Sequence, residues 1–370
     1  MKMTDCIGLY VHIPFCKSKC GYCDFYSFVS DESAMNRYLD CLLKRAEDYA
    51  SGIKRSIDTI YIGGGTPSVF GGERIRHLLE RLKSCFAVTS DCEITVECNP
   101  SSVDEPLVKT LKAAGVNRIS MGLQSAVTSE RKSLGRLSDS EQAKRAVRLF
   151  QESGFENLSL DLMLGLENQT LLTLDESLDF ILSLDVKHVS AYLLKLEEGT
   201  PLFERRNSLS LPDEDAVCQL YLHTVNELAK HGIVQYEISN FARPGFESRH
   251  NLKYWNDEEY LGLGPGAHSF LDGRRFYFER DFAGFLKGNQ PITDGLGGGE
   301  EEYIMLRLRL KDGLRFDEYK KRYQKEFPER IIKKAEELKQ YEVLICDKSG
   351  IRLTEKGFLL SNSVIAGLLS

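Results

Sequence analysis

The chain has 370 residues, of which 42% are hydrophobic and 28% are charged, a composition typical of a folded protein that excludes a disordered chain. Its net charge of −7 argues against a broad phosphate-binding surface, so nucleic acid is not an expected partner. Because no apolar run approaches the roughly 20 residues that cross a bilayer and the first residues lack an export signal, we expect a cytoplasmic protein without a membrane span.

From the start to about residue 200, short apolar segments alternate with amphipathic ones, a pattern that predicts βα units around a parallel sheet. Six such units predict an α/β fold with an open, partial (βα)6 barrel of the TIM type. The predicted strands are residues 7–13, 59–64, 93–99, 118–123, 157–165 and 188–196, and the predicted helices include residues 32–50, 73–86, 140–154 and 171–184.

The pattern changes after Pro201. A predicted helix at 211–232 and a strand-like segment at 235–242 lead into an irregular stretch rich in aromatic residues and glycine, which we interpret as an extension of the barrel. Gly295 and glycines 297–299 indicate a linker before a small α-rich, winged-helix-like C-terminal domain that ends in a strand-turn pattern at 349–369. The predicted division is therefore 1–200, 201–294 and 295–370.

Three of the ten cysteines, Cys16, Cys20 and Cys23, lie on one short loop directly after the first predicted strand. The carboxyl end of a strand is where barrels place their active sites. Intervals of three and two residues let this loop direct three thiolates at a common centre. Because a [4Fe-4S] cluster usually takes four cysteines, three predict a cluster with one iron left open. A zinc ion on the same thiolates and His12 is the alternative.

The segment CKSKCGYC, residues 16–23, resembles the CxxxCxxC signature of the radical-SAM superfamily, and GGGTP at residues 63–67 ends the second predicted strand. The resemblance implies a [4Fe-4S] cluster whose open iron chelates S-adenosylmethionine (SAM), the source of a 5′-deoxyadenosyl radical. It also implies that Tyr22 lies against the adenine and that Gly64, Gly65 and Thr66 contact the methionine. Taken alone, the glycines indicate only a tight turn.

The same resemblance implies further SAM-binding residues at strand ends. Arg136 has the guanidinium that suits a carboxylate, and each of the acceptor side chains can bind ribose hydroxyls or the amino group. Taken singly, Arg136 could instead be a surface charge and Asp161 a turn residue. The residues that the resemblance assigns to SAM in this way are Tyr10, Glu97, Gln124, Arg136 and Asp161.

Within the superfamily, YVHIPFC and GGGTPS resemble the relatives of oxygen-independent coproporphyrinogen III dehydrogenase. That enzyme has a fourth cysteine where this chain has Phe25, and a long segment before the cluster where only 15 residues precede Cys16. HNLKYW, residues 250–255, is similar to the HNxxYW motif of the haem-chaperone branch, HemW. The resemblance therefore implies a haem chaperone, and the oxidative decarboxylase of haem synthesis remains the alternative.

His250 could supply an axial nitrogen to haem iron, with Asn251 beside it and Tyr254 and Trp255 offering apolar surface. In the alternative, His250 has a structural role: it forms hydrogen bonds with Tyr254, and Trp255 packs under the barrel extension. The implied partners are haem and a haem-acceptor protein, with a respiratory enzyme as one candidate, and relatives suggest a homodimer. We assign no catalytic residue. His268, in a glycine-rich turn, is expected to face the same cleft and to support the groups that bind there, and Cys98 is the spare thiol expected near the cleft.

Overall fold

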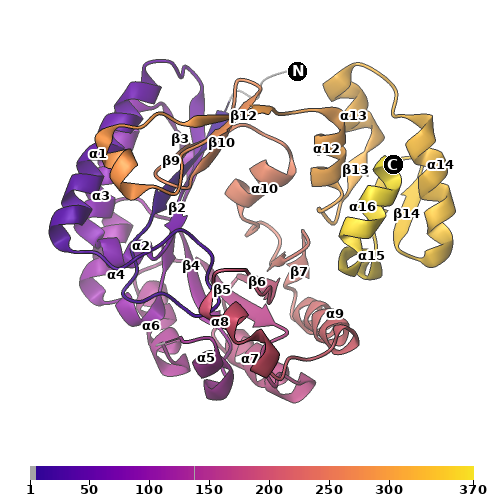
Figure 1. The fold of residues 1–370 in the computed structure, drawn as a ribbon, viewed down its shortest axis with the longest axis horizontal. Coiled ribbons are helices and arrows are strands. Elements are labelled where there is room, and N and C mark those ends of the chain that lie inside the picture. Colours follow the sequence, from indigo (N-terminus) through magenta and orange to yellow (C-terminus); the bar gives the residue numbers. More distant parts are fainter. Residues whose placement is uncertain (1–5, 137) are drawn as a thin grey trace.

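The computed structural model describes residues 6–136 and 138–370 (Figure 1). At its centre six parallel strands lie side by side in chain order, which confirms the predicted partial (βα)6 barrel. The strands are β1 (Cys6–Ile13), β2 (Ser56–Gly64), β3 (Val88–Cys98), β4 (Arg118–Gln124), β5 (Asn157–Leu164) and β6 (His188–Leu193). The connecting helices are α1 (Glu32–Ala50), α2 (Pro67–Phe70), α3 (Gly72–Cys85), α4 (Glu105–Ala113), α5 (Thr128–Ser133), α6 (Ser140–Glu152) and α7 (Leu171–Ser183), with a 3-10 turn at Pro100–Ser102.

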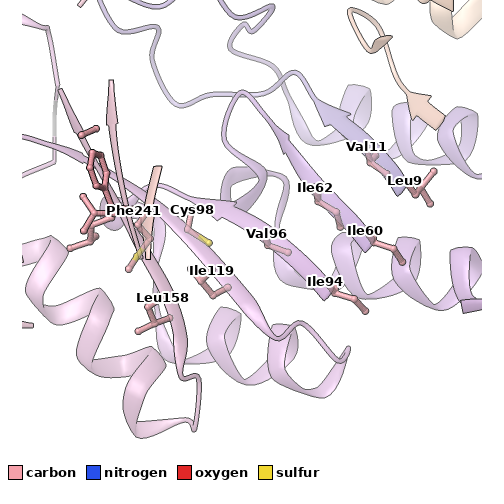
Figure 2. Close-up of a cluster of buried hydrophobic side chains, with 14 of the residues drawn as sticks. Leu9, Val11, Ile60, Ile62, Ile94, Val96, Cys98, Ile119, Leu158 and Phe241 are labelled. Carbon is pink, nitrogen blue, oxygen red and sulfur yellow. The ribbon is translucent and has the colours of Figure 1, made fainter. Parts of the chain in front are cut away.

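Alternating side chains give the central strands two different faces. One set is apolar and buried between the sheet and the helices, where each side chain contributes roughly 1.5–3 kcal/mol to folding. The intervening residues face the inside of the barrel, and many of them are polar. Figure 2 shows the apolar set on the first three strands as Leu9, Val11, Ile60, Ile62, Ile94 and Val96.

The barrel is open because β1 and β6 do not pair with each other but continue into the rest of a twelve-stranded sheet. Beyond β1, strand β9 runs parallel to it, and β10, β11 and β12 follow as antiparallel neighbours. The added strands are β7 (Val234–Gln235), β8 (Asn240–Ala242), β9 (Tyr260–Leu263), β10 (His268–Leu271), β11 (Arg274–Tyr277) and β12 (Ile292–Leu296). The helices of this region are α8 (Pro201–Glu204), α9 (Glu214–Lys230), α10 (Arg249–Trp255) and α11 (Phe282–Lys287), with a 3-10 turn at Arg206–Ser208.

The single strand predicted at 235–242 is wrong, because this segment forms a tight hairpin of β7 and β8. The buried carboxylate of Glu237 accepts the backbone N–H of Ser239 at 3.1 Å and the side-chain amide of Asn240. These bonds fold the chain back on itself between the two short strands.

The C-terminal region is mainly helical around a small sheet of order β13-β15-β14. Gly295 lies inside β12, so only glycines 297–299 join the large sheet to this region. The predicted final strand-turn pattern is correct for its strand, β15. After this strand Thr354 caps the first of two helices, α15 and α16, where no helix was predicted. The elements are α12 (Glu300–Arg307), β13 (Leu314–Arg315), α13 (Phe316–Tyr323), α14 (Glu329–Leu338), a 3-10 turn at Lys339–Tyr341, β14 (Leu344–Asp347), β15 (Gly350–Leu353), α15 (Glu355–Leu359) and α16 (Ser361–Leu369).

Helix α10, which carries the HNLKYW segment, is held at both ends. At its start the Glu93 carboxylate accepts the backbone N–H groups of Arg249 and His250, each at 3.0 Å. Just after its end, buried Asp257 accepts from Arg322 of α13 at 2.6 Å. The helix therefore joins the inside of the barrel to the C-terminal region. None of the helices within the described ranges is both long and apolar enough to cross a membrane.

We expect Glu93→Ala to lower the free energy of unfolding by about 3 kcal/mol, because it removes two hydrogen bonds to a charged acceptor and leaves backbone donors unsatisfied. Urea denaturation measures this loss. The matched control is Glu80→Ala, which removes a carboxylate that is 56% exposed in an ion pair with Arg76 and should change stability by less than about 0.5 kcal/mol. Equal losses in the two variants would contradict the anchoring role of Glu93.

Candidate functional site

The loop that carries the three cysteines is fixed at its base. The backbone N–H of Cys16 donates to the carbonyl of Phe28 at 3.0 Å, and the N–H of Phe28 donates to that of Pro14 at 2.9 Å. Between them the ring of Phe15 is completely buried and packs edge-on against Phe28. The two ends of the loop therefore lie next to each other at the carboxyl end of β1.

The tip of this loop is also tied down. The N–H of Gly21 donates to the carbonyl of Leu134 at 2.9 Å, and the N–H of Leu202 donates to the carbonyl of Gly21 at 2.8 Å. These two partners come from different βα units. The cysteines are thus held between the end of β1 and the connections that follow β4 and β6.

The GGGTP segment at the end of β2 lies directly against the base of the cysteine loop. The N–H of Gly65 donates to the carbonyl of Ile13, and the N–H of Thr66 donates to that of Phe15, both at 2.8 Å. A Cβ atom on Gly65 would stand 2.8 Å from the Phe15 carbonyl oxygen, so only glycine permits this approach. The Thr66 hydroxyl then lies 3.4 Å from the thiol of Cys16.

A cavity of about 330 Å³ opens at this end of the barrel, a volume within the range of small-molecule sites. It brings together all three cysteines and nearly all of the residues predicted to hold SAM. Phe25 and the spare thiol of Cys98 also line it, as expected for Cys98. The predicted residues that line the cavity are Cys16, Cys20, Tyr22, Cys23, Gly64, Gly65, Thr66, Glu97, Gln124, Arg136, Asp161 and Asn251.

Two carboxylates lie on the inner wall of the cavity. Glu97 accepts the hydroxyl of Tyr61 at 2.7 Å and the backbone N–H of Gly64 at 3.0 Å, while burial raises the pKa of its carboxyl to about 7. Burial likewise raises the pKa of Asp161 to about 6, and Ser120 donates to this carboxylate at 3.3 Å. Both groups are poised to ionise near neutral pH when a cationic or hydrogen-donating ligand enters.

Opposite these acids, Arg136 and Gln124 present polar atoms without partners among the described residues. Arg136 donates to the carbonyl of Gly122 and lies 3.9 Å from the thiol of Cys20, but its Nε is buried and unbonded. The side-chain oxygen of Gln124 is likewise buried and has no hydrogen-bond partner among the described residues. Buried polar atoms normally find a partner, so these two fit a bound ligand that has both acceptors and donors.

Five polar side chains that line the cavity from strands β2, β4 and β6 were not predicted. Arg118 is 1% exposed, and its charge lies close enough to Glu93 and Asp161 to interact with both carboxylates. Arg118, Ser120 and Gly122 alternate with apolar residues along β4. This alternation in the sequence could have identified them as residues that face the inside of the barrel. The unpredicted residues are Tyr61, Arg118, Ser120, Ser190 and Tyr192.

Tyr10 is not among the residues that line the cavity, and its contact with SAM stays a prediction. Its hydroxyl is bonded to Nδ1 of His12 at 3.0 Å, and its ring stacks on that of His250. The Nε2 atom of His12 is bonded to the carbonyl of Tyr26 at 2.8 Å. With both of its ring nitrogens engaged, His12 is not directed at the cysteines as the zinc alternative requires.

Among the residues that the structure describes, no three His, Cys, Asp or Glu side chains are close enough together to hold one metal ion. A mononuclear zinc site needs such convergence. A cubane cluster does not, since each of its cysteines ligates a different iron. The donor arrangement therefore favours the cluster over zinc.

His250 is 1% exposed and does not reach the cavity. Its Nδ1 is bonded to the hydroxyl of Thr59 and its Nε2 to the hydroxyl of Tyr254, both at 2.8 Å. Burial lowers the pKa of His250 to about 3, so the ring is neutral. Tyr254 also packs edge-on against Tyr260, and Trp255 is half-exposed. Of the HNLKYW side chains, only Asn251 lines the cavity, and the arrangement matches the structural alternative for His250.

Comparison with known proteins extends these observations to the whole chain. The radical SAM superfamily profile matches residues 10–181, and the HemN C-terminal domain profile matches residues 301–360. The structure of coproporphyrinogen III oxidase (HemN) from Escherichia coli, a radical SAM enzyme, superposes with a TM-score of 0.84 over 98% of this chain and 89% of that one. At 22% identity this likeness shows the fold.

Haem chaperones named HemW are more similar in sequence. The protein from Lactococcus lactis is 35% identical over 97% of this chain and 96% of its own length. That from Bacillus subtilis is 33% identical over 97% and 98%, and that from Escherichia coli is 39% identical over 76% of each. With relatives this similar along nearly its full length, the chain belongs to the HemW family of haem chaperones within the radical SAM superfamily.

Proposed function

We propose that this chain binds haem and transfers it to an acceptor protein, and that it carries a [4Fe-4S] cluster and SAM in the cavity at the carboxyl end of the barrel. The observation that carries this proposal is the single cavity in which the three cysteines meet the predicted SAM residues. The full-length similarity to haem chaperones supplies the function that the cavity serves.

Cys16, Cys20 and Cys23 would hold the cluster, each through its thiolate to a different iron, with the fourth iron free for SAM. Bound there, the cluster supplies an electron to the sulfonium of SAM. The protein contributes position, because the loop is fixed at base and tip before any metal enters. Thr66 and Arg136 lie beside the thiols of Cys16 and Cys20 and can donate to their sulfurs, which stabilises the thiolate form.

The unpartnered atoms of the cavity fit SAM. Arg136 has a free Nε for the methionine carboxylate, and the Gln124 oxygen can accept from the amino group. Glu97 and Asp161 can accept from ribose hydroxyls and offset the sulfonium charge. Tyr22 lines the same cavity and supplies an aromatic face for the adenine.

The alternative function, oxidative decarboxylation of coproporphyrinogen III, draws on the fold that this chain shares with HemN. A shared fold does not transfer an activity. Phe25 stands where that enzyme has its fourth cysteine, and it is 66% exposed and lines the cavity. This difference within the site favours the chaperone function.

Replacing any one of Cys16, Cys20 and Cys23 by Ala should reduce iron and acid-labile sulfide to a small fraction of the wild-type content, since two thiolates do not retain a cubane. Metal and sulfide analysis of anaerobically reconstituted protein measures this loss. Cys98→Ala, in the same cavity, is the control and should keep the wild-type content. Full retention by any of the three variants would exclude that cysteine as a ligand.

Affinity for SAM should rise between about pH 6 and pH 8. The raised pKa of Glu97, about 7, means that its carboxyl is largely protonated at pH 6 and must lose this proton to receive a cationic ligand. Below that pKa we expect up to about a tenfold loss of affinity per pH unit. Equilibrium dialysis with labelled SAM tests this, and Glu97→Gln should bind more weakly with a much flatter pH profile. An unchanged profile in the variant would assign the titration to another group.

Ferric haem titrated into the purified chain should bind saturably at a fixed stoichiometry, visible as a defined Soret band. In parallel, anaerobic incubation with coproporphyrinogen III, SAM and a reductant should yield no divinyl product. A protein of similar net charge that has no haem site is the control for non-specific uptake. Linear, unsaturable uptake of haem would contradict the carrier role, and formation of the divinyl porphyrinogen would establish the enzyme instead.

A further inference from the structure

A haem carrier needs a place for haem, and two candidate places are unsuitable. The cavity of about 330 Å³ is the place proposed for the cluster and SAM, so it is already assigned to other ligands. His250 has both ring nitrogens bonded inside the protein. An axial ligand is therefore expected among the histidines that can present a nitrogen to solvent.

All seven histidines of the chain lie in its described part, and most have ring nitrogens already engaged. His12 and His250 are described above, and buried His188 is bonded to Ser159 at 2.7 Å and Tyr236 at 2.9 Å. His223 is paired with Asp175 through Nε2, and exposed His231 is bonded through Nδ1 to a carbonyl of its own helix; neither ring packs against an aromatic side chain of the described residues. This leaves His77 and His268, for which the structure gives no hydrogen bond at the ring within residues 6–136 and 138–370.

His77 and His268 differ in the side chains that surround them. His77 stands on the charged outer face of α3, next to Arg76 and its ion pairs with Glu73 and Glu80. His268 is exposed at the start of β10, and its ring stacks on that of Tyr277 with centroids 5.1 Å apart. Only His268 combines an accessible imidazole with an aromatic neighbour.

His268 belongs to a row of side chains across the outer strands of the sheet. It pairs with Tyr277 of β11, which in turn pairs with Ile292 of β12, so the three side chains share one face. The next pair on this face is Phe270 with Tyr260, and Tyr260 pairs with Gly8 of β1 beside α10. The row thus continues the inner face of the barrel outward across β9, β10, β11 and β12, of which β9, β10 and β12 are labelled in the upper part of Figure 1.

Positive charge lies next to this row. Burial lowers the pKa of the His268 imidazole and so do Arg280 and Arg275, while Asp294 opposes them, which keeps the ring neutral and able to bind a metal at pH 7. The Arg280 side chain is 59% exposed and contacts Asp24 through an ion pair at 3.4 Å and a hydrogen bond to its backbone carbonyl at 3.3 Å. Since Asp24 directly follows Cys23, Arg280 also places the row beside the cysteine loop.

We propose that His268 is the axial ligand to haem iron in this chain, with Tyr277 and Ile292 under the macrocycle and Arg280 paired with a propionate. The assignment rests on the proposed haem-carrier function and gives it a site separate from the SAM cavity. The imidazole donates a nitrogen lone pair to iron, the aromatic and aliphatic side chains cover one face of the ring, and a guanidinium matches a carboxylate in geometry and charge.

Ferric haem titration of the full chain, followed by Soret absorption and electron paramagnetic resonance, tests the site. His268→Gly should weaken binding at least tenfold and lose the histidine-ligated spectrum, and added imidazole should restore that spectrum, which a merely structural defect would not allow. His77→Gly is the matched control, an exposed histidine that should leave affinity and spectrum unchanged.

The outcomes separate the inference from the function on which it rests. If the wild-type chain showed no saturable binding, the haem-carrier function itself would fail. If the wild-type chain bound haem and His268→Gly gave the same affinity and spectrum, the site would be overturned. Loss of the spectrum in His250→Gln, with His268→Gly unaffected, would assign the ligand to the HNLKYW helix instead.

Discussion

The close approach of two backbone segments at the ends of β1 and β2 is the constraint on which the site depends. Gly65 and Thr66 donate to the carbonyls of Ile13 and Phe15, and no side chain fits between these segments. The contact fixes where the cysteine loop leaves the sheet, and therefore where three thiols can gather. It also places the Thr66 hydroxyl beside Cys16, so the same GGGTP segment orients the metal ligands and forms the wall against which a small molecule would rest.

Inside the barrel the sheet encloses charges of both signs. Arg118, Arg136, Glu97 and Asp161 all line one cavity, and burial holds both acids near the point of ionisation. Such an interior costs stability, since charged groups lose hydration there. The apolar layer between strands and helices, with Leu9, Ile60 and their neighbours, offsets this loss because its burial stabilises the fold.

Much of this could be predicted from local patterns. Alternation along the strands identified six βα units, and the matched motifs identified most of the cavity, because both signals are contained in short stretches of sequence. What such patterns do not reveal are contacts between residues far apart in the chain. The partner that buries His250 is Thr59, 191 residues away in the chain. Likewise a buried carboxylate, Glu237, breaks the strand predicted at 235–242, and no local pattern reveals that burial.

The two-ended anchoring of α10 has a thermodynamic consequence. Glu93 belongs to the barrel and Arg322 to the C-terminal region, yet each binds a group at one end of the same short helix. Neither region can unfold without stripping hydrogen-bond partners from the other. The divisions near residues 200 and 295 therefore describe the order of elements along the chain, and we expect cooperativity to extend across both of them, with the polypeptide melting as one unit.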